Sequence, residues 1–177
     1  MAIAEQVEVR RLAPAEAREQ LDALAAVLAD CVEGGASVGY LAPFSHAEAR
    51  VAFEGFADEA AAGRRIILGA FLGGALVGTA QLVVGLPPNQ PHRAEIARVL
   101  VHRSARRRGI AQRLMEQLER EAHAEGKTLL VLDAVTDGDA ARLYERLGWI
   151  TLGVIPNYAL YPDGRFCDTT VFWKAIE

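Results

Sequence analysis

Cysteine is scarce in this chain, which has two among its 177 residues. Cys31 and Cys167 show no metal-ligand spacing and are too few for a disulfide framework, so we expect a reducing compartment, the cytoplasm. The four histidines are scattered along the sequence, and we expect no metal ion. The net charge is −4, and no basic stripe with interleaved aromatic residues is present, which argues against nucleic-acid binding.

A secretion signal and a membrane helix are also not expected. Charged residues between Glu5 and Arg11 interrupt the apolar core that a signal would need. The stretch from Ile66 to Pro91 has no charge and is long enough to suggest a membrane span. Gly73-Gly74 divides it into two β-prone segments, which favours a hairpin instead.

Apolar residues make up 51% of the chain, and no repeat or linker divides it, so we expect one domain over residues 1–177. Hydrophobic periodicity and turn residues predict an α/β fold with a mixed sheet of about seven strands and about four helices. The nearly continuous apolar segment 128–135 predicts a strand buried on both faces. Strands are expected at 7–10, 66–72, 75–84, 93–101, 128–135, 150–161 and 166–174, and helices at 15–32, 45–62, 110–125 and 139–147.

Three consecutive arginines, Arg106, Arg107 and Arg108, stand before Gly109 and the helix that begins at Ile110. The positive end of a helix dipole disfavours cations by roughly 0.3–1 kcal/mol each, so this arrangement indicates an anionic ligand. Free backbone N–H groups and a glycine that allows close approach would complete a phosphate cradle. The segment matches neither the P-loop nor the dinucleotide pattern, and the alternative to a cradle is a solvated cluster of charges.

Two segments resemble motifs of the GNAT family of acetyltransferases. Arg106-x-x-Gly109-x-Ala111 is similar to the family pattern (Q/R)-x-x-G-x-(G/A). The segment 137–149 is similar to N-x-x-A-x-x-L-Y-x-x-x-G-(F/W), although Asp137 replaces the usual asparagine. The resemblance implies the GNAT fold, in which the sheet splays open between its fourth and fifth strands. The matching residues of the second motif are Ala140, Leu143, Tyr144, Gly148 and Trp149.

The resemblance also implies acetyl-CoA as the co-substrate. Backbone N–H groups from Arg107 to Ala111 would bind the pyrophosphate, and the backbone of Leu100 and Val101 would pair with the pantetheine arm like an added strand. A backbone N–H on a bulge of the fourth strand would stabilise the oxyanion. The residues expected to contact acetyl-CoA are Val99, Leu100, Val101, Arg106, Arg107, Arg108, Gly109, Ile110, Ala111, Asp137, Ala140 and Tyr144.

Tyr144 stands where many GNAT enzymes carry the acid that protonates the departing thiolate. The pKa values of a thiol, about 8.5, and of a phenol, about 10, suit this proton transfer. Glu95 and Asp133 are the candidates for the base that deprotonates the amine, because burial among apolar neighbours would raise a carboxyl pKa. Structural alternatives stay open: Tyr144 would only pack against the sheet, Glu95 would pair with Arg93 or Arg98, and Asp133 would cap a loop.

The acceptor site is expected to combine Ser37 and Tyr40 from loop 34–40, Tyr158 from the closing hairpin, and the carboxylates of Glu95 and Asp133. The carboxylates would attract a cationic amine. Parts of the chain outside the cofactor motifs are similar to GNAT enzymes that acetylate an amine of a β-lactam toxin. These parts are 34–39, 93–95 and 162–165.

The favoured hypothesis is an N-acetyltransferase for a primary amine of a small molecule, such as an amino-acid-like toxin or antibiotic. The alternatives are a protein N-terminal or lysine acetyltransferase on the same fold and a non-catalytic acyl-CoA-binding sensor. We expect a monomer or homodimer that binds neither nucleic acid nor membrane.

Overall fold

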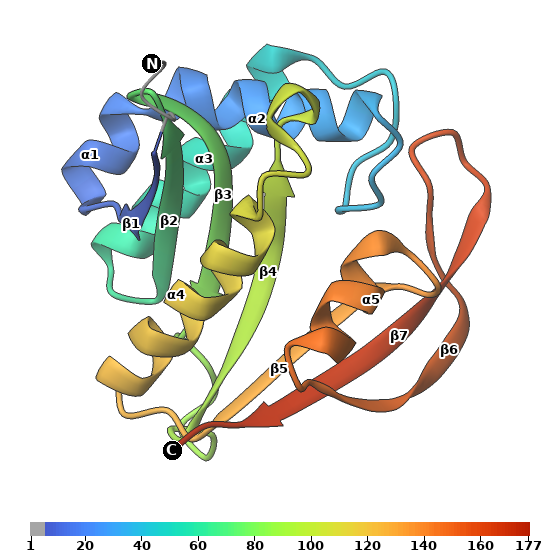
Figure 1. The fold of residues 1–177 in the computed structure, drawn as a ribbon. Helices are drawn as coiled ribbons and strands as arrows, with labels where there is room; N and C mark the ends of the chain where they lie inside the picture. The colour runs from blue at the N-terminus through green and yellow to red at the C-terminus, as the bar shows by residue number, and fades with distance from the viewer. Residues whose placement is uncertain (1–5) are drawn as a thin grey trace.

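The computed structural model describes residues 6–177, and the seven strands of this part form one mixed sheet, which confirms the predicted fold class (Figure 1). Glu5, used above against a secretion signal, lies outside the described residues, so that expectation stays a prediction. The sheet order is β1-β2-β3-β4-β5-β7-β6. The strands are β1 (Val7–Arg11), β2 (Arg65–Leu72), β3 (Ala75–Val83), β4 (Arg93–Val101), β5 (Leu129–Val135), β6 (Ile150–Leu160) and β7 (Phe166–Ala175).

The described residues form five α-helices rather than about four. The single helix predicted over 15–32 is wrong, because the chain leaves the helical conformation at Gln20, with φ −93° and ψ 8°. Neither proline nor glycine marks this break, but it lets Ala17 before it and Leu21 after it enter the same core. The helices are α1 (Pro14–Glu19), α2 (Leu21–Glu33), α3 (His46–Ala61), α4 (Ile110–Ala124) and α5 (Asp139–Arg146), with a 3-10 turn at Arg103–Ala105.

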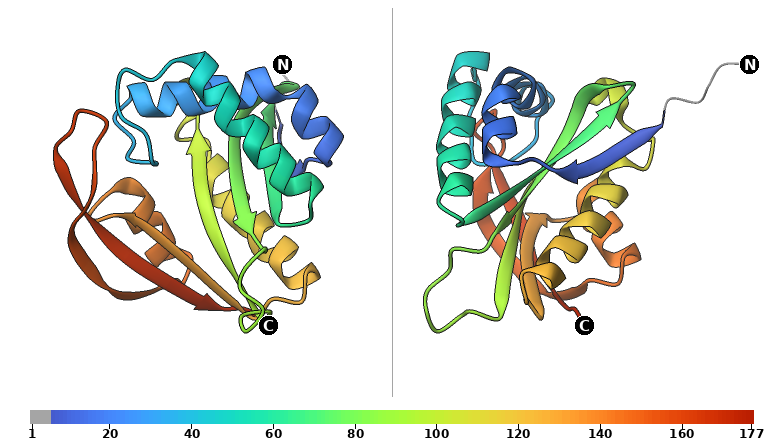
Figure 2. Two further views of the ribbon diagram at one scale, coloured as in Figure 1. Left: turned by 180° about the vertical axis from the view of Figure 1, so that it is seen from behind. Right: turned by 90° about the vertical axis from the view of Figure 1, so that its left-hand side faces the viewer.

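Helices cover both faces of the sheet (Figure 2). The helices α1, α2 and α3 pack on one face, which we call the α3 face, and α4 and α5 pack on the other, the α4 face. Successive side chains along a strand point to opposite faces of the sheet, so each strand contributes apolar side chains to the cores on both faces. In β2, for example, Ile67 is buried on the α3 face, whereas Ile66 and Leu68 are buried on the α4 face.

Local sequence signals explain where the principal helices begin and end. The N-terminus of α3 has a capping box, in which the Glu48 N–H donates to Ser45 Oγ at 3.2 Å and the Ser45 N–H donates to Glu48 Oε2 at 2.8 Å. Gly109 and Gly126 bracket α4 with φ angles of 72° and 71°, a left-handed conformation that favours glycine. The apolar stripe of α4 is buried against the sheet at Ile110, Leu114, Met115, Leu118 and Ala122.

The uncharged stretch after Ile66 folds as the predicted hairpin of β2 and β3. Its turn has φ angles of 58° at Gly73 and 84° at Gly74, the signs that a type I′ turn requires at both central residues. Across residues 6–177, no helix has both the length and the apolar character needed to cross a membrane.

The sheet opens between β4 and β5. These parallel strands pair over three residues only, from Arg93↔Leu129 to Glu95↔Val131, and then diverge (Figure 1). The expectation that segment 128–135 is buried on both faces is therefore wrong. Leu130 and Leu132 are buried on the α4 face, but Asp133 on the other side is exposed, because no strand or helix of residues 6–177 covers the α3 face of β5 beside the opening.

Candidate active site

The loop before α4 presents unpaired backbone donors. The first α4 hydrogen bond runs from the Arg113 N–H to the Gly109 carbonyl at 3.1 Å, so the N–H groups of Ile110, Ala111 and Gln112 have no carbonyl partner within residues 6–177. A Cβ built on Gly109 would meet no atom of the protein within 4 Å, which leaves space against these donors. The arrangement fits a pyrophosphate group.

The three arginines do not behave alike. The side chain of Arg106 points back toward the end of β4, where its Nε donates to the Val101 carbonyl at 3.1 Å. Arg107 has a φ of 62°, which shapes the loop, and both Arg107 and Arg108 are exposed. All three arginines are exposed, but the Arg106 guanidinium is already hydrogen-bonded to the end of β4, so Arg107 and Arg108 have the freer charges for an anion from solvent.

Past the opening of the sheet, β4 has a free edge. Leu100 and Val101 pair with Thr79 and Gly78 on the β3 side, but β5 has already diverged on the other side. The strand carries the expected bulge. Gln81 pairs with Ala97 and Thr79 pairs with Leu100, so β4 has one more residue than β3 between these two pairs. Backbone groups near Val99 thus border the opening, where an extended ligand could add to β4.

The second motif places one aromatic side chain beside the opening. Tyr144 of α5 is 5% exposed and packs against Trp149 and Phe172, with ring centroids 6.2 Å and 5.8 Å away. Its hydroxyl forms no hydrogen bond with residues 6–177, and burial, followed by the charge of Asp133, raises the pKa of this phenol. Asp137, with φ 59°, and Ala140 lie exposed at the start of α5.

The two carboxylates lie on the α3 face of the opening. Glu95 pairs in register with Val83, Asp133 lies two residues beyond the Glu95↔Val131 pair, and paired residues point to the same face. Glu95 forms an ion pair with Arg93 Nη1 at 2.7 Å, one of the structural alternatives. Asp133 makes no such pair within the described chain, and loss of hydration, followed by the charge of Glu95, raises its pKa although the side chain is exposed.

The expected acceptor loops meet across the two arms of the sheet. Ser37 Oγ donates to the Leu160 carbonyl at 2.7 Å, and the Ala42 N–H donates to the Pro162 carbonyl at 2.9 Å. In Figure 1 the loop after α2 accordingly lies beside the end of the β6–β7 hairpin. Tyr40 stacks on Phe44 at 4.4 Å within the α3-face core, whereas Tyr158 is 55% exposed on the edge strand β6.

Sequence reasoning did not single out Arg98 as a site residue, and treated it only as a partner for Glu95. The structure gives that role to Arg93 and places Arg98 in the β4 bulge, with φ 51° and its guanidinium 4.4 Å above the ring of Phe56. The available signal was a basic residue in the interior of a predicted strand.

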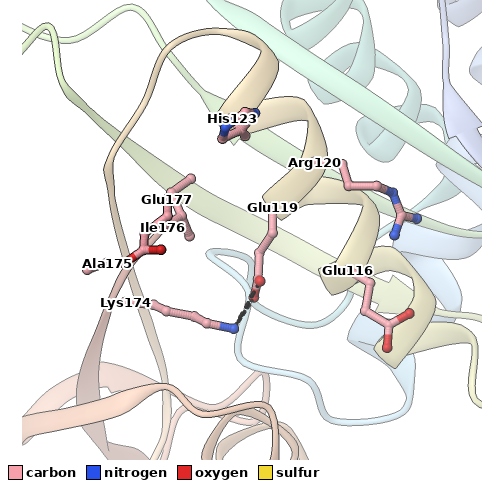
Figure 3. Close-up of a pocket in the computed structure, with 8 residues that line it drawn as sticks. All are labelled: Glu116, Glu119, Arg120, His123, Lys174, Ala175, Ile176 and Glu177. Atoms are coloured by element: carbon pink, nitrogen blue, oxygen red, sulfur yellow. Dashed lines mark hydrogen bonds and ion pairs between the residues drawn. The ribbon is translucent and has the colours of Figure 1, made fainter.

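A separate groove, drawn in Figure 3, lies at the closed end of the sheet, where Ala175 pairs with Leu129. Lys174 Nζ in this groove is bound to Glu119 at 2.8 Å and to the Leu147 carbonyl at 2.9 Å, so its charge is satisfied within the protein. The groove therefore does not belong to the site around the opening. Over residues 6–177 no three His, Cys, Asp or Glu side chains gather as metal ligands would.

Comparison with known proteins agrees with this geometry. The model of the acetyltransferase (GNAT) family matches residues 23–149. A Salmonella typhimurium protein named as an acetyltransferase, solved with its cofactor acetyl-CoA, is similar with 19% identity and a TM-score of 0.77, over 97% of this chain and 94% of its own.

Two further solved structures share the fold. Ribosomal-protein-alanine N-acetyltransferase from Brucella melitensis has 23% identity and a TM-score of 0.78, over 96% of this chain and 99% of its own. A protein named as a phosphinothricin N-acetyltransferase has 16% identity and a TM-score of 0.78, over 97% of this chain and 99% of its own. At these identities the likeness shows the fold and does not choose between their acceptors. Since the family model covers most of the chain, the protein belongs to the GNAT family and is an acetyl-CoA-dependent N-acetyltransferase.

Proposed function

We propose that the acceptor is a primary amine of a small molecule, such as an amino-acid-like toxin or antibiotic. The observation that carries this proposal is the contact between the loop after α2 and the β6–β7 connection, through Ser37–Leu160 and Ala42–Pro162. This contact bridges the two arms of the splayed sheet at the far end of the β6–β7 hairpin and so limits the approach of a bulky acceptor. The segments 34–39, 93–95 and 162–165 also resemble the tabtoxin resistance acetyltransferase, which acetylates an amine of a β-lactam toxin.

Acetyl-CoA would lie in the opening of the sheet. The unpaired N–H groups of Ile110 and Ala111, with Arg107 and Arg108, would hold its pyrophosphate, and the free edge of β4 at Leu100 would pair with the pantetheine arm. Backbone donors and arginines would thus supply the recognition of the pyrophosphate and pantetheine parts. Coenzyme A supplies the activated thioester, and the chain supplies the proton transfers.

Asp133 would act as the base. An alkyl ammonium group must lose a proton before its nitrogen can attack the thioester carbonyl carbon. Asp133 is free of ion pairs within the described chain and its pKa is raised, whereas Glu95 is held by Arg93. Glu95 would instead add to the negative field that attracts the cationic amine and would hold a water molecule on the proton path.

Tyr144 would act as the acid from the opposite face of the opening. As the new C–N bond forms and the C–S bond breaks, the departing sulfur takes a proton from the Tyr144 hydroxyl, and the resulting phenolate is converted back to the phenol by the second proton that the amine loses. The Tyr144 phenol is protonated at neutral pH, as an unperturbed tyrosine also is, and burial raises its pKa further. Its lack of a hydrogen-bond partner within residues 6–177 leaves the hydroxyl free for the sulfur.

The test is release of coenzyme A thiol from acetyl-CoA with a panel of amino acids, dipeptides, polyamines and amine antibiotics, including a β-lactam amino acid. We expect one small amine to reach a kcat/KM of at least about 10⁴ M⁻¹s⁻¹, the lower end of ordinary enzymes. Turnover confined to protein N-termini or lysine peptides would show a macromolecular acceptor. Coenzyme A binding without turnover on either set would show a sensor.

A further inference from the structure

Arg98 is a partly buried cation without a counter-ion. It makes no hydrogen bond or ion pair with residues 6–177, and its Nε is buried without a partner. A guanidinium removed from water in this way costs free energy unless an anion compensates it. The positive φ of 51° at Arg98 shows that the bulge, rather than a regular strand position, sets where this side chain points.

The neighbouring polar groups do not supply that anion. Arg65 lies over the same Phe56 ring, 4.8 Å from its centroid, and is neutralised by Glu59 at 2.6 Å. Arg65 Nη1 also donates to Gln81 Oε1 at 2.6 Å, which fixes the amide orientation because a guanidinium can only donate. The Gln81 Nε2 is then buried without a partner. Hydrogen-bond donors are therefore in excess around Arg98.

This donor-rich site lies on the acceptor side of the sheet. Gln81 pairs with Ala97, and Ile67 pairs with Gln81, so these residues share the α3 face with Glu95. The pyrophosphate cradle belongs to the N-terminus of α4, on the other face. Glu95 and Arg98 are three residues apart, at most about 10 Å between Cα atoms at 3.3 Å per residue. Side chains of opposite charge thus lie on the same face of β4, within a separation that the two ends of a small zwitterion could span.

We propose that Arg98 binds the carboxylate of the acceptor, so that the substrate is an amino acid whose amine is held near Glu95 and Asp133. This inference rests on the proposed small-molecule acetyltransferase activity and adds a specificity-determining residue to it. The Arg98 guanidinium carbon lies 4.4 Å from the centroid of the Phe56 ring, and a guanidinium can bind a carboxylate through two parallel hydrogen bonds. Amines that lack a carboxylate would leave Arg98 unpaired and would be poor acceptors.

The test compares each amino acid of the panel with its carboxamide, in wild type and in Arg98→Gln and Arg98→Lys. We expect wild type to prefer the acid, and Arg98→Gln to lower kcat/KM for the acid by about 10- to 100-fold, the range of charge-assisted hydrogen bonds, and to lower kcat/KM for the neutral amide much less. Arg98→Lys should restore part of the preference. Arg120→Gln, which removes a charge beside the distant groove of Figure 3, should change neither.

Calorimetric titration with coenzyme A separates the ways in which this proposal can fail. If Arg98→Gln binds coenzyme A normally but loses acid and amide turnover equally, Arg98 only supports the bulge, and the small-molecule activity stands without the carboxylate site. If wild type itself does not distinguish acid from amide, the carboxylate site is refuted. If wild type acetylates no small amine, the proposed function and this inference are both wrong.

Discussion

Gly109 allows a sharp test of the proposed pyrophosphate site, through Gly109→Ala. Its φ of 72° is left-handed, so an alanine there costs about 1–2 kcal/mol of folding free energy from backbone strain. The new methyl group would meet no protein atom within 4 Å, so no packing clash adds to that cost. For a chain of this length the melting temperature should fall by roughly 2–8 °C.

Gly126 offers a matched control at the other end of the same helix. Its φ is 71°, and a Cβ there would also meet no atom within 4 Å. Gly126→Ala should therefore lose the same stability as Gly109→Ala. Only the methyl group at Gly109 would stand in the path of a phosphate approaching the N–H groups of Ile110 and Ala111, so only this variant should bind coenzyme A more weakly.

The assay is calorimetry with coenzyme A, accompanied by thermal unfolding of both variants. We expect the Kd of Gly109→Ala to rise at least about tenfold, which corresponds to roughly 1.4 kcal/mol, and that of Gly126→Ala to stay near the wild-type value. Kinetics with acetyl-pantetheine, which lacks the pyrophosphate, should show no difference between the two variants. Equal coenzyme A affinity in both variants would refute the cradle at Gly109.

Three further predictions concern catalysis and stability. Tyr144→Phe should lower kcat by about 10²- to 10⁴-fold and leave the Kd of coenzyme A nearly unchanged; an unaltered kcat in steady-state kinetics would remove its role as the acid. Asp133→Asn should melt at a higher temperature than wild type at pH 8. Because the pKa of Asp133 is raised in the folded state, ionisation of this carboxyl lowers the stability of wild type as pH rises from the ordinary pKa, near 3.9, through the folded-state pKa. The higher melting temperature of Asp133→Asn should therefore disappear below that pH window. A variant less stable than wild type at pH 8 would contradict this reasoning. Ser45→Ala should lose about 1 kcal/mol in urea unfolding through its capping box, with no change in kcat.

The base can be identified by the pH dependence of kcat/KM in Asp133→Asn and Glu95→Gln. If Asp133 is the base, the acidic limb of the profile follows its raised pKa and is lost in Asp133→Asn, while Glu95→Gln mainly raises KM for a cationic amine. The reverse pattern would assign the base to Glu95. An unchanged limb in both variants would mean that the amine loses its proton by another route.

Much of the fold was predictable because its signals are local. The capping box at Ser45, the glycine pair of the β2–β3 turn and the apolar stripe of α4 each depend on residues within a few positions of one another. The loop at Gly109 and the helix that carries Tyr144 were predictable for the same reason. The break at Gln20 was not, because no local signal marks it and the packing of α1 and α2 into one core decides it.

The sequence by itself therefore determined the elements, their order and the two motif segments, since hydrophobic period, glycine conformation and capping are properties of neighbouring residues. Only the tertiary structure decided which charged side chains form ion pairs within the protein and which do not. Strand register and one extra residue in β4 pair Glu95 with Arg93 and leave Arg98 over Phe56 without a counter-ion among residues 6–177. The divergence of β4 from β5 after Glu95 exposes Asp133, because a pairing partner is set by the whole sheet and not by adjacent sequence.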